Sequence, residues 1–120
     1  MSSKTLLVTR KVNGQTLLTQ CAEASSLTRR LVGLLNHSEL SENQGMLIQP
    51  CKQVHTLFMR FSIDAVFLDK ANVVVAIEEL KPWRISKMHF RAHKVLELAL
   101  GMCRKHALQV GEVLELGGSC

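Results

Sequence analysis

The stretch AVFLDKANVVVAI, residues 65–77, decides the fold class of this 120-residue chain. Two β-prone apolar runs, 65–68 and 73–77, flank the four residues DKAN, and no helical spacing of apolar residues interrupts them. Asp and Asn are residues that form tight turns, because their side chains hydrogen-bond to the nearby backbone. The stretch therefore predicts a β-hairpin with a four-residue turn at 69–72.

Further strands are predicted on both sides of this hairpin. In TLLVTRKVNGQTLLTQC, residues 5–21, two β-prone runs flank Asn13-Gly14, a dipeptide that tolerates the positive φ angles of a tight type I′ turn. MLI (46–48) reads as a short strand that Pro50 either ends or places at a sheet edge. Three more strands are predicted at VHTLFM (54–59) and at the two VLEL strings, 95–98 and 113–116.

Helical periodicity is confined to short segments. Leucines at 27, 31, 34 and 35 lie on one face of a helix, and residues 102–108 allow a helical turn or two. The sum is seven or eight short strands with one or two short helices. This predicts a mainly-β domain, a compact antiparallel sandwich or barrel spanning residues 1–120, with an open α+β sheet as the alternative.

Composition indicates a globular protein of the cytoplasm. Hydrophobic residues make up 47% and charged residues 21% of the chain, which is ordinary for a folded domain. No apolar run approaches the roughly 18 residues of a membrane span, and the N-terminus lacks the hydrophobic centre of a secretory signal. We therefore expect a cytoplasmic location, no membrane partner, and free thiols at Cys21, Cys51, Cys103 and Cys120.

The net charge of +5 lies entirely in one segment, KPWRISKMHFRAHK (81–94), which contains no acidic residue. Cations mixed with aromatic residues suit RNA or single-stranded nucleic acid. The residues that would contact nucleic acid are Lys81, Trp83, Arg84, Lys87, Arg91 and Lys94. The alternative, which we prefer, is a long solvated loop with Trp83 packed into the core.

The segment PCKQVHTLFMRFSIDAVFLD, residues 50–69, contains most of the candidate chemistry. Cys51, His55 and Met59 are soft donors for zinc or copper, and Cys51 with His55 could form a catalytic thiol–imidazole pair. On a strand, residues four apart are about 13 Å apart, so neither arrangement forms unless the chain bends. We expect no metal and no cofactor, and the preferred role of the thiol and thioether is core packing.

Arg60 and Asp64 are charges set among apolar neighbours, where an unpaired charge is costly. One interpretation is an internal salt bridge that closes the bend after Arg60. The other is a site in which Arg60 binds a carboxylate or phosphate, His55 and Thr56 add donors, and Asp64 orients the guanidinium.

Several strings together resemble the prokaryotic family known as domain of unknown function 192 (DUF192). They are GLLNHSEL (33–40), GMLI (45–48), VHTLFMRFSIDAVFLD (54–69), LKPW (80–83), VLEL (95–98) and VGEVLEL (110–116). The resemblance covers about residues 16–116 and implies a compact mainly-β sandwich or barrel. It implies no activity or cofactor, although His55, Thr56, Met59, Arg60 and Asp64 match the family motif. Ser62 departs from it, since proline is frequent there.

These observations predict a single-domain binding module with a small-anion or carboxylate pocket at His55, Thr56, Arg60 and Asp64. The ligand would be a small anion or an acidic group on a partner. One alternative is a metal-assisted or thiol-based enzyme that uses Cys51 and His55. A third is a nucleic-acid accessory protein that uses residues 81–94.

Overall fold

The computed structural model describes residues 5–24, 40–57 and 59–118, which form seven strands and one short helix. The strands are β1 (Thr5–Arg10), β2 (Thr16–Ala24), β3 (Gln44–Ile48), β4 (Ile63–Leu68), β5 (Val74–Leu80), β6 (Lys94–Ala99) and β7 (Leu114–Gly118), and the helix is α3 (Met102–Lys105). The predicted mainly-β fold with short strands is confirmed. The predicted helix over residues 27–35 lies outside the described residues.

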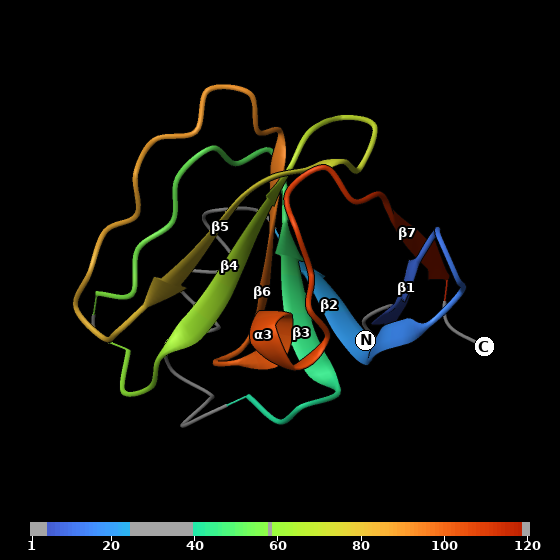
Figure 1. Cartoon of the computed structure of the whole chain (residues 1–120). Coiled ribbons are helices and arrows are strands. Elements are labelled where there is room, and N and C mark those ends of the chain that lie inside the picture. The colour runs from blue at the N-terminus through green and yellow to red at the C-terminus, as the bar shows by residue number, and fades with distance from the viewer. Residues whose placement is uncertain (1–4, 25–39, 58, 119–120) are drawn as a thin grey trace.

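All seven strands belong to one strongly curved sheet in the order β5-β4-β6-β3-β2-β1-β7 (Figure 1). Neighbours pair antiparallel except β2 and β3, which are parallel. The curvature brings the two edges together at one end, where Val73 forms an isolated bridge with Val113 and the Val74 N–H donates to the Glu112 carbonyl. Beyond this contact β5 and β7 do not pair, so the sheet is not closed into a barrel.

The hairpin that decided the fold class forms as predicted. Strands β4 and β5 pair in antiparallel register from Ile63–Leu80 to Leu68–Val74. The Asp69 carboxylate accepts the N–H groups of Ala71 and Val73, which is the side-chain turn chemistry expected of Asp.

The hairpin of β1 and β2 is also confirmed, but its turn is different from the predicted type I′ turn. That turn needs positive φ at both central residues, and here Gly14 has φ 73° whereas Asn13 is not in the left-handed region. The chain instead makes a five-residue loop, 11–15, in which the Arg10 N–H donates to the Gln15 carbonyl. The Asn13 side chain caps the loop by accepting the Gln15 N–H.

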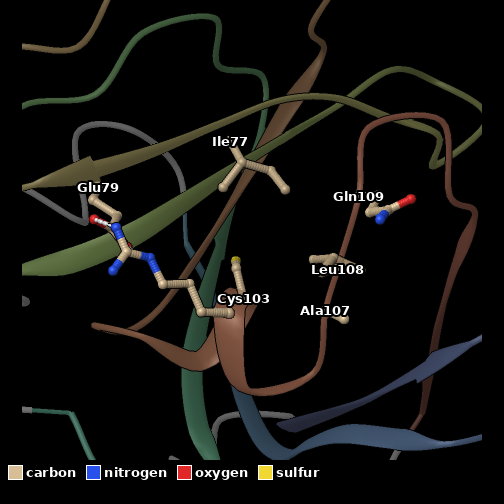
Figure 2. A pocket seen from close by; sticks show the side chains of 7 residues that line it. Ile77, Glu79, Cys103, Ala107, Leu108 and Gln109 are labelled. Atoms are coloured by element: carbon tan, nitrogen blue, oxygen red, sulfur yellow. Dashed lines mark hydrogen bonds and ion pairs between the residues drawn. The ribbon is translucent and has the colours of Figure 1, made fainter.

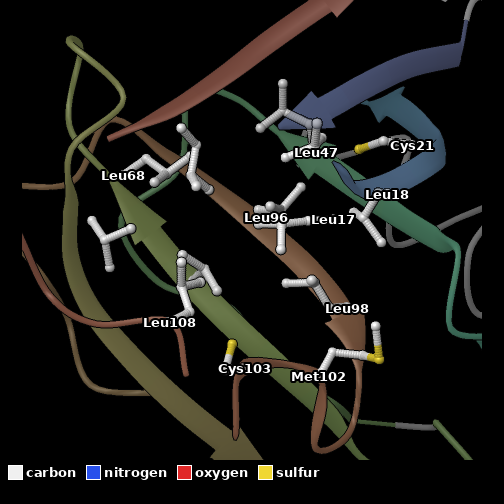
Figure 3. Packing of buried hydrophobic residues seen from close by; sticks show 14 residues of the cluster. Leu17, Leu18, Cys21, Leu47, Leu68, Leu96, Leu98, Met102, Cys103 and Leu108 are labelled. Carbon is white, nitrogen blue, oxygen red and sulfur yellow. The ribbon is translucent and has the colours of Figure 1, made fainter. Parts of the chain in front are cut away.

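Strand β4 lies between two hydrophobic clusters, and all six of its residues are buried. On one face Val66 and Leu68 pack with residues of β1, β2, β3, β6, β7 and α3 (Figure 3). On the other face Ile63, Ala65 and Phe67 pack against Val54, Met59 and Ala92, which come from two long loops. The curled end of the sheet thus covers one face of β4 and the loops cover the other.

The predicted strand at 54–59 does not form, and this was wrong. The described residues between β3 and β4, 49–57 and 59–62, form no strand, and among them only His55 makes an isolated bridge, to Ile85. The expected alternation of side chains fails with the strand, since Thr56 is buried and Arg60 is exposed. Pro50 does end β3, but β3 is an interior strand and not an edge.

The two VLEL strings lie in strands as predicted, one in β6 and one in and just before β7. In β6 both leucines are buried in the first cluster and Glu97, on the opposite face, is buried as well. In β7 Leu114 is buried and Glu115 is exposed. The residues 102–108 begin with the single turn of α3, as the sequence suggested.

Candidate functional site

The candidate site lies where two long loops, 49–62 and 81–93, run side by side along one flank of the molecule (Figure 1). Backbone hydrogen bonds join them at regular intervals: the Trp83 N–H donates to Thr56, the Ser86 N–H to Val54 and the His89 N–H to Lys52. The segment quoted above for its chemistry and the basic segment are therefore one structural unit. This pairing was not predictable from either segment alone.

Thr56 holds the two loops together. Its side chain is fully buried, and its hydroxyl donates to the Lys81 carbonyl at 2.5 Å while accepting the Arg84 N–H at 2.9 Å. Its backbone N–H donates to Arg84 and its carbonyl accepts Met59 and Trp83. Thr56 thus positions both its own loop and the start of loop 81–93.

His55 and Cys51 are both half-buried in the same loop. The His55 Nδ1 accepts the Leu57 N–H at 3.3 Å, which leaves a proton on Nε2 when the ring is neutral. The Cys51 thiol donates to the Gln53 carbonyl at 3.1 Å. These contacts do not test catalysis by the pair, so the thiol-based enzyme stays a prediction.

Arg60 and Asp64 lie apart, and the internal salt bridge considered from the sequence does not form. Arg60 is exposed and, within the described ranges, makes no ion pair. Asp64 is fully buried, and its Oδ2 accepts the Cys103 N–H at 2.9 Å at the start of α3, while its Oδ1 has no hydrogen-bond partner. Asp64 thus lies on the side of β4 that faces the first cluster, whereas Val54 and Met59 pack on the other face.

A cavity of about 330 Å³ lies beside α3, between that helix and β5 (Figure 2). Cys103 lines its inner wall, and the ion pair of Arg104 with Glu79, 2.9 Å, lies at its rim. Burial and the neighbouring Asp64 carboxyl raise the pKa of the Cys103 thiol, so the thiol is neutral at pH 7. No motif predicted this cavity, because its remaining walls are the ordinary residues Ile77, Ala107, Leu108 and Gln109.

The basic segment is a loop as predicted, but Trp83 is not in the core: 55% of its surface is exposed. Its backbone, at φ 63°, is held to Thr56 in a way that directs the side chain outward. Lys81, Arg84, Lys87 and Arg91 are exposed too, whereas Lys94 is half-buried and donates to the Asn72 amide oxygen at 2.6 Å. A nucleic-acid role for these residues stays a prediction.

The described residues contain three free thiols and no cluster of metal ligands. Within residues 5–24, 40–57 and 59–118, no three His, Cys, Asp or Glu side chains gather closely enough to hold a metal ion. Cys21, Cys51 and Cys103 are free thiols, as the sequence indicated; Cys120 lies outside the described residues. No helix in these ranges is long and apolar enough to cross a bilayer.

The geometry defines a small mainly-β domain in which two paired loops gather most of the motif residues. Residues 8–116 match the family model of domain of unknown function 192, described as an uncharacterized ACR. The chain therefore belongs to the DUF192 family, and the resemblance seen in the sequence is confirmed.

Curated relatives are uncharacterised proteins as well. The chain is 37% identical over 62 residues to a UPF0127 protein of Pyrococcus abyssi and 39% identical over 62 residues to one of Pyrococcus furiosus. In each case the match covers 52% of this chain and 53% of the relative. The chain thus spans about half the length of the curated relatives that it matches.

Two crystal structures share the fold. One, from Sinorhizobium meliloti 1021 and described as a putative transcription regulator, has a TM-score of 0.74 at 19% identity and covers 96% of this chain and 94% of that chain. The other, a protein of unknown function from Novosphingobium aromaticivorans, has a TM-score of 0.75 at 18% identity over 92% of this chain and 82% of that one. Likeness at this level of identity shows the fold alone.

Proposed function

We propose that this chain is a cytoplasmic single-domain binding module that recognises a small anion or an acidic group of a partner. The site is the surface formed by loops 49–62 and 81–93, and its central residue is Arg60. One observation carries the proposal: Arg60 is exposed and, among the described residues, its guanidinium makes neither an ion pair nor a hydrogen bond. A planar guanidinium with free N–H groups is suited to bidentate binding of carboxylate or phosphate.

The surroundings of Arg60 support an anion rather than a cation. The turn from Thr56 to Met59 precedes it and is held against Lys81 and Arg84, both exposed, by the hydrogen bonds of Thr56. Arg60 therefore follows a turn that is bonded to a loop with exposed cations, and positive charges of this kind attract an anion before it makes contact. His55 is the further donor on this surface, and Thr56 acts by positioning.

Asp64 has no part in the proposed site. Its carboxylate is fully buried on the other face of β4 and accepts the Cys103 N–H at the start of α3. A group in that position cannot orient an exposed guanidinium. The pocket predicted from the sequence is thus proposed in a smaller form, with His55 and Arg60 as donors.

The test is a thermal-shift panel with inorganic phosphate, citrate and glutamate on wild type and Arg60→Ala. We expect one of these anions to raise the melting temperature of the wild type by about 5 °C at ten times its dissociation constant. Arg60→Ala should lose this protection while the ligand-free variant melts within about 2 °C of wild type, since exposed side chains contribute little to stability.

Arg104→Ala is the matched control, because Arg104 is also an exposed arginine, 80% accessible, but lies on α3. It removes the same charge and should keep the protection. The proposal fails if Arg60→Ala is protected like wild type, or if no anion protects the wild type. It also fails if ligand-free Arg60→Ala is unfolded, because Arg60 would then be structural.

A further inference from the structure

Loop 81–93 has a repeat of three residues that the sequence reading did not identify. The backbone N–H groups of Trp83, Ser86 and His89 all donate to loop 49–62. The side chains of Ser86 and Ala92 are buried, and His89 lies half-buried against the Phe67 ring at 4.2 Å. From position 86 to position 92 every third side chain therefore faces the protein, and the two side chains between face outward, whereas Trp83 is exposed.

The outward residues are cations paired with large apolar side chains. They are Arg84 with Ile85, Lys87 with Met88, and Arg91 with Phe90, all exposed. Ile85 is 61% and Phe90 is 78% exposed. Together with Trp83 these six residues form what we call the cation–apolar strip.

This concentration of exposed apolar side chains is unusual for a protein surface. Of the seven large hydrophobic side chains that are exposed in the described residues, four lie between positions 83 and 90. The other three, Val12, Leu100 and Val110, are scattered. Isolated exposed hydrophobic residues need no explanation, but a contiguous group indicates an interaction surface.

Lys52 and Glu78 anchor part of the strip's backbone to the rest of the protein. Lys52 donates from Nζ to the carbonyls of Phe90 and Ala92 at 2.8 and 2.7 Å. Glu78 accepts the Lys87 N–H at 3.0 Å and contacts the His89 ring at 2.6 Å. These contacts hold the loop to the body of the protein while its outward side chains stay exposed.

We propose that the cation–apolar strip docks on an anionic membrane surface, with its apolar side chains in the interface and its cations on lipid headgroups. Each outward pair offers both contacts that peripheral binding requires. Trp83 is of the residue type that is enriched at the membrane–water boundary. Peripheral docking of this kind needs no spanning helix. The proposal does not rest on the anion site at Arg60, although Arg84 belongs to both surfaces.

The apolar members of the strip favour lipid over single-stranded nucleic acid. Nucleic acid binds through cations and through rings that stack on bases. Ile85 and Met88 have no ring, yet they are exposed beside Arg84 and Lys87. Two of the four apolar residues thus have no role in base stacking, whereas all four gain by leaving water at a membrane.

The full chain can report its own binding, because Trp83 is its only tryptophan and Tyr is absent. It is mixed with vesicles of pure phosphatidylcholine, or of phosphatidylcholine with about one-third phosphatidylserine. We expect a blue shift of the emission and co-sedimentation with the anionic vesicles only. Raising the salt from about 0.1 M to about 0.5 M should weaken both signals.

Two double variants separate the contributions. Ile85→Ser with Met88→Ser should weaken vesicle binding at least about tenfold. Lys87→Ala with Arg91→Ala should weaken it by a factor of about twenty-five, or about fivefold for each cation.

Each has a matched control elsewhere on the surface. Val12→Ser with Val110→Ser, at 76% and 62% exposed, matches the apolar pair, and Lys11→Ala with Lys70→Ala matches the charge change at two other exposed lysines. Both controls should bind like wild type. All four variants alter exposed residues, and a melting curve checks that they fold.

Three results would overturn the proposal. The first is no shift and no sedimentation with anionic vesicles at low salt. The second is wild-type binding by the Ile85→Ser, Met88→Ser variant, which would mean contact through charge alone. The third is that the protein binds a thymidine oligomer and no vesicles, with oligomer binding weakened by Phe90→Ser but unchanged in the Ile85→Ser, Met88→Ser variant. That result would assign the strip to nucleic acid.

Discussion

Thr56 illustrates how a single buried hydroxyl can fix the relative position of two loops. It has one donor and two acceptor positions, and the contacts to Lys81 and Arg84 use the donor and one acceptor. Thr56→Val keeps the shape and removes both contacts, so the Lys81 carbonyl and the Arg84 N–H lose a partner in a buried setting.

We expect Thr56→Val to lower the free energy of unfolding by about 2–4 kcal/mol. Urea denaturation measures this, and faster hydrogen exchange at the Arg84 amide would locate the loss in loop 81–93. Thr56→Ser, which keeps the hydroxyl, is the control and should lose about 1 kcal/mol or less through its missing methyl. Equal losses in the two variants would contradict the hydrogen-bonding role.

Cys21 is a fully buried thiol of the first cluster (Figure 3). Burial, and next the charge of Glu23, raise its pKa from 9.0 to about 12. The unfolded chain therefore loses this proton at a lower pH than the folded protein does. Stability from the neutral thiol is complete below about pH 9 and is lost as the pH rises toward about 12.

We therefore expect wild type to lose stability on going from about pH 8 to about pH 10.5 by more than Cys21→Ala does, by about 1–2 kcal/mol. Denaturant midpoints at the two pH values give the difference. Comparison with the variant cancels the ionisation of lysines and of Cys103, which both proteins share. Equal losses of stability in both proteins would show that the Cys21 thiol ionises as easily in the folded protein as in the unfolded chain.

Strand β3 shows why a glycine is needed inside a sheet. A Cβ on Gly45 would lie 2.5 Å from Leu18 Cδ1 and 2.7 Å from the Glu97 carbonyl oxygen. The leucine can move, but the carbonyl belongs to β6, which pairs with β3 at this point. The close approach of two backbones therefore excludes a side chain.

Gly45→Ala should cost about 2–3 kcal/mol through this overpacking, measured by urea denaturation. Gly117→Ala in β7 is the matched control, since nothing lies within 4 Å of its added Cβ. The close-packing account is wrong if the two alanines cost the same.

At the scale of elements, the sequence predicted strands well where the two faces of a strand differ in polarity or where both faces are buried. The 65–77 stretch folds as predicted because hairpins combine local turn chemistry with local pairing. The strand predicted at 54–59 was wrong. Val54 and Met59 are buried because the loop that contains them packs on the sheet, not because they belong to a strand. Single-residue spacing cannot distinguish such a loop from a strand.

At the scale of the whole molecule, Arg10 connects the N-terminal strand to the segment that leads into β7. Its guanidinium forms a two-pronged contact with Glu112, with Nη2 to Oε2 at 2.9 Å, and donates from Nη1 to the His106 carbonyl at 2.7 Å. Both charged side chains are nearly buried, at 14% and 12% exposed. This contact lies near the Val73–Val113 bridge, where the two sheet edges meet.

Arg10→Lys keeps the charge but cannot make the forked contact. We expect it to lower the free energy of unfolding by about 1–3 kcal/mol, because hydrogen bonds to buried charged groups are lost. Arg104→Lys, at an exposed ion pair on α3, is the control and should change stability by less than about 0.5 kcal/mol. If both variants have the wild-type midpoint of denaturation, the contact of Arg10 with Glu112 has no role in joining the edges of the sheet.

Some of the candidate site could be predicted from the sequence and some could not. The motif identified His55, Thr56 and Arg60, and their loop does lie at the surface. It also included Asp64, four residues beyond Arg60, which a turn and a strand direct to the opposite face. The outward direction of Trp83 had no local signal, because the Thr56 contacts that set it come from 27 positions earlier in the chain.

The sequence by itself determined the two hairpins, the strands apart from the one expected at 54–59, the basic segment and the family, since these depend on residue order over short spans. Tertiary structure alone decided that loops 49–62 and 81–93 lie together, that Asp64 is buried and Arg60 is exposed, and that the cation–apolar strip faces water. The physical reason is that pairing between distant segments is selected by the burial and hydrogen bonding of the complete chain. No local pattern contains that information.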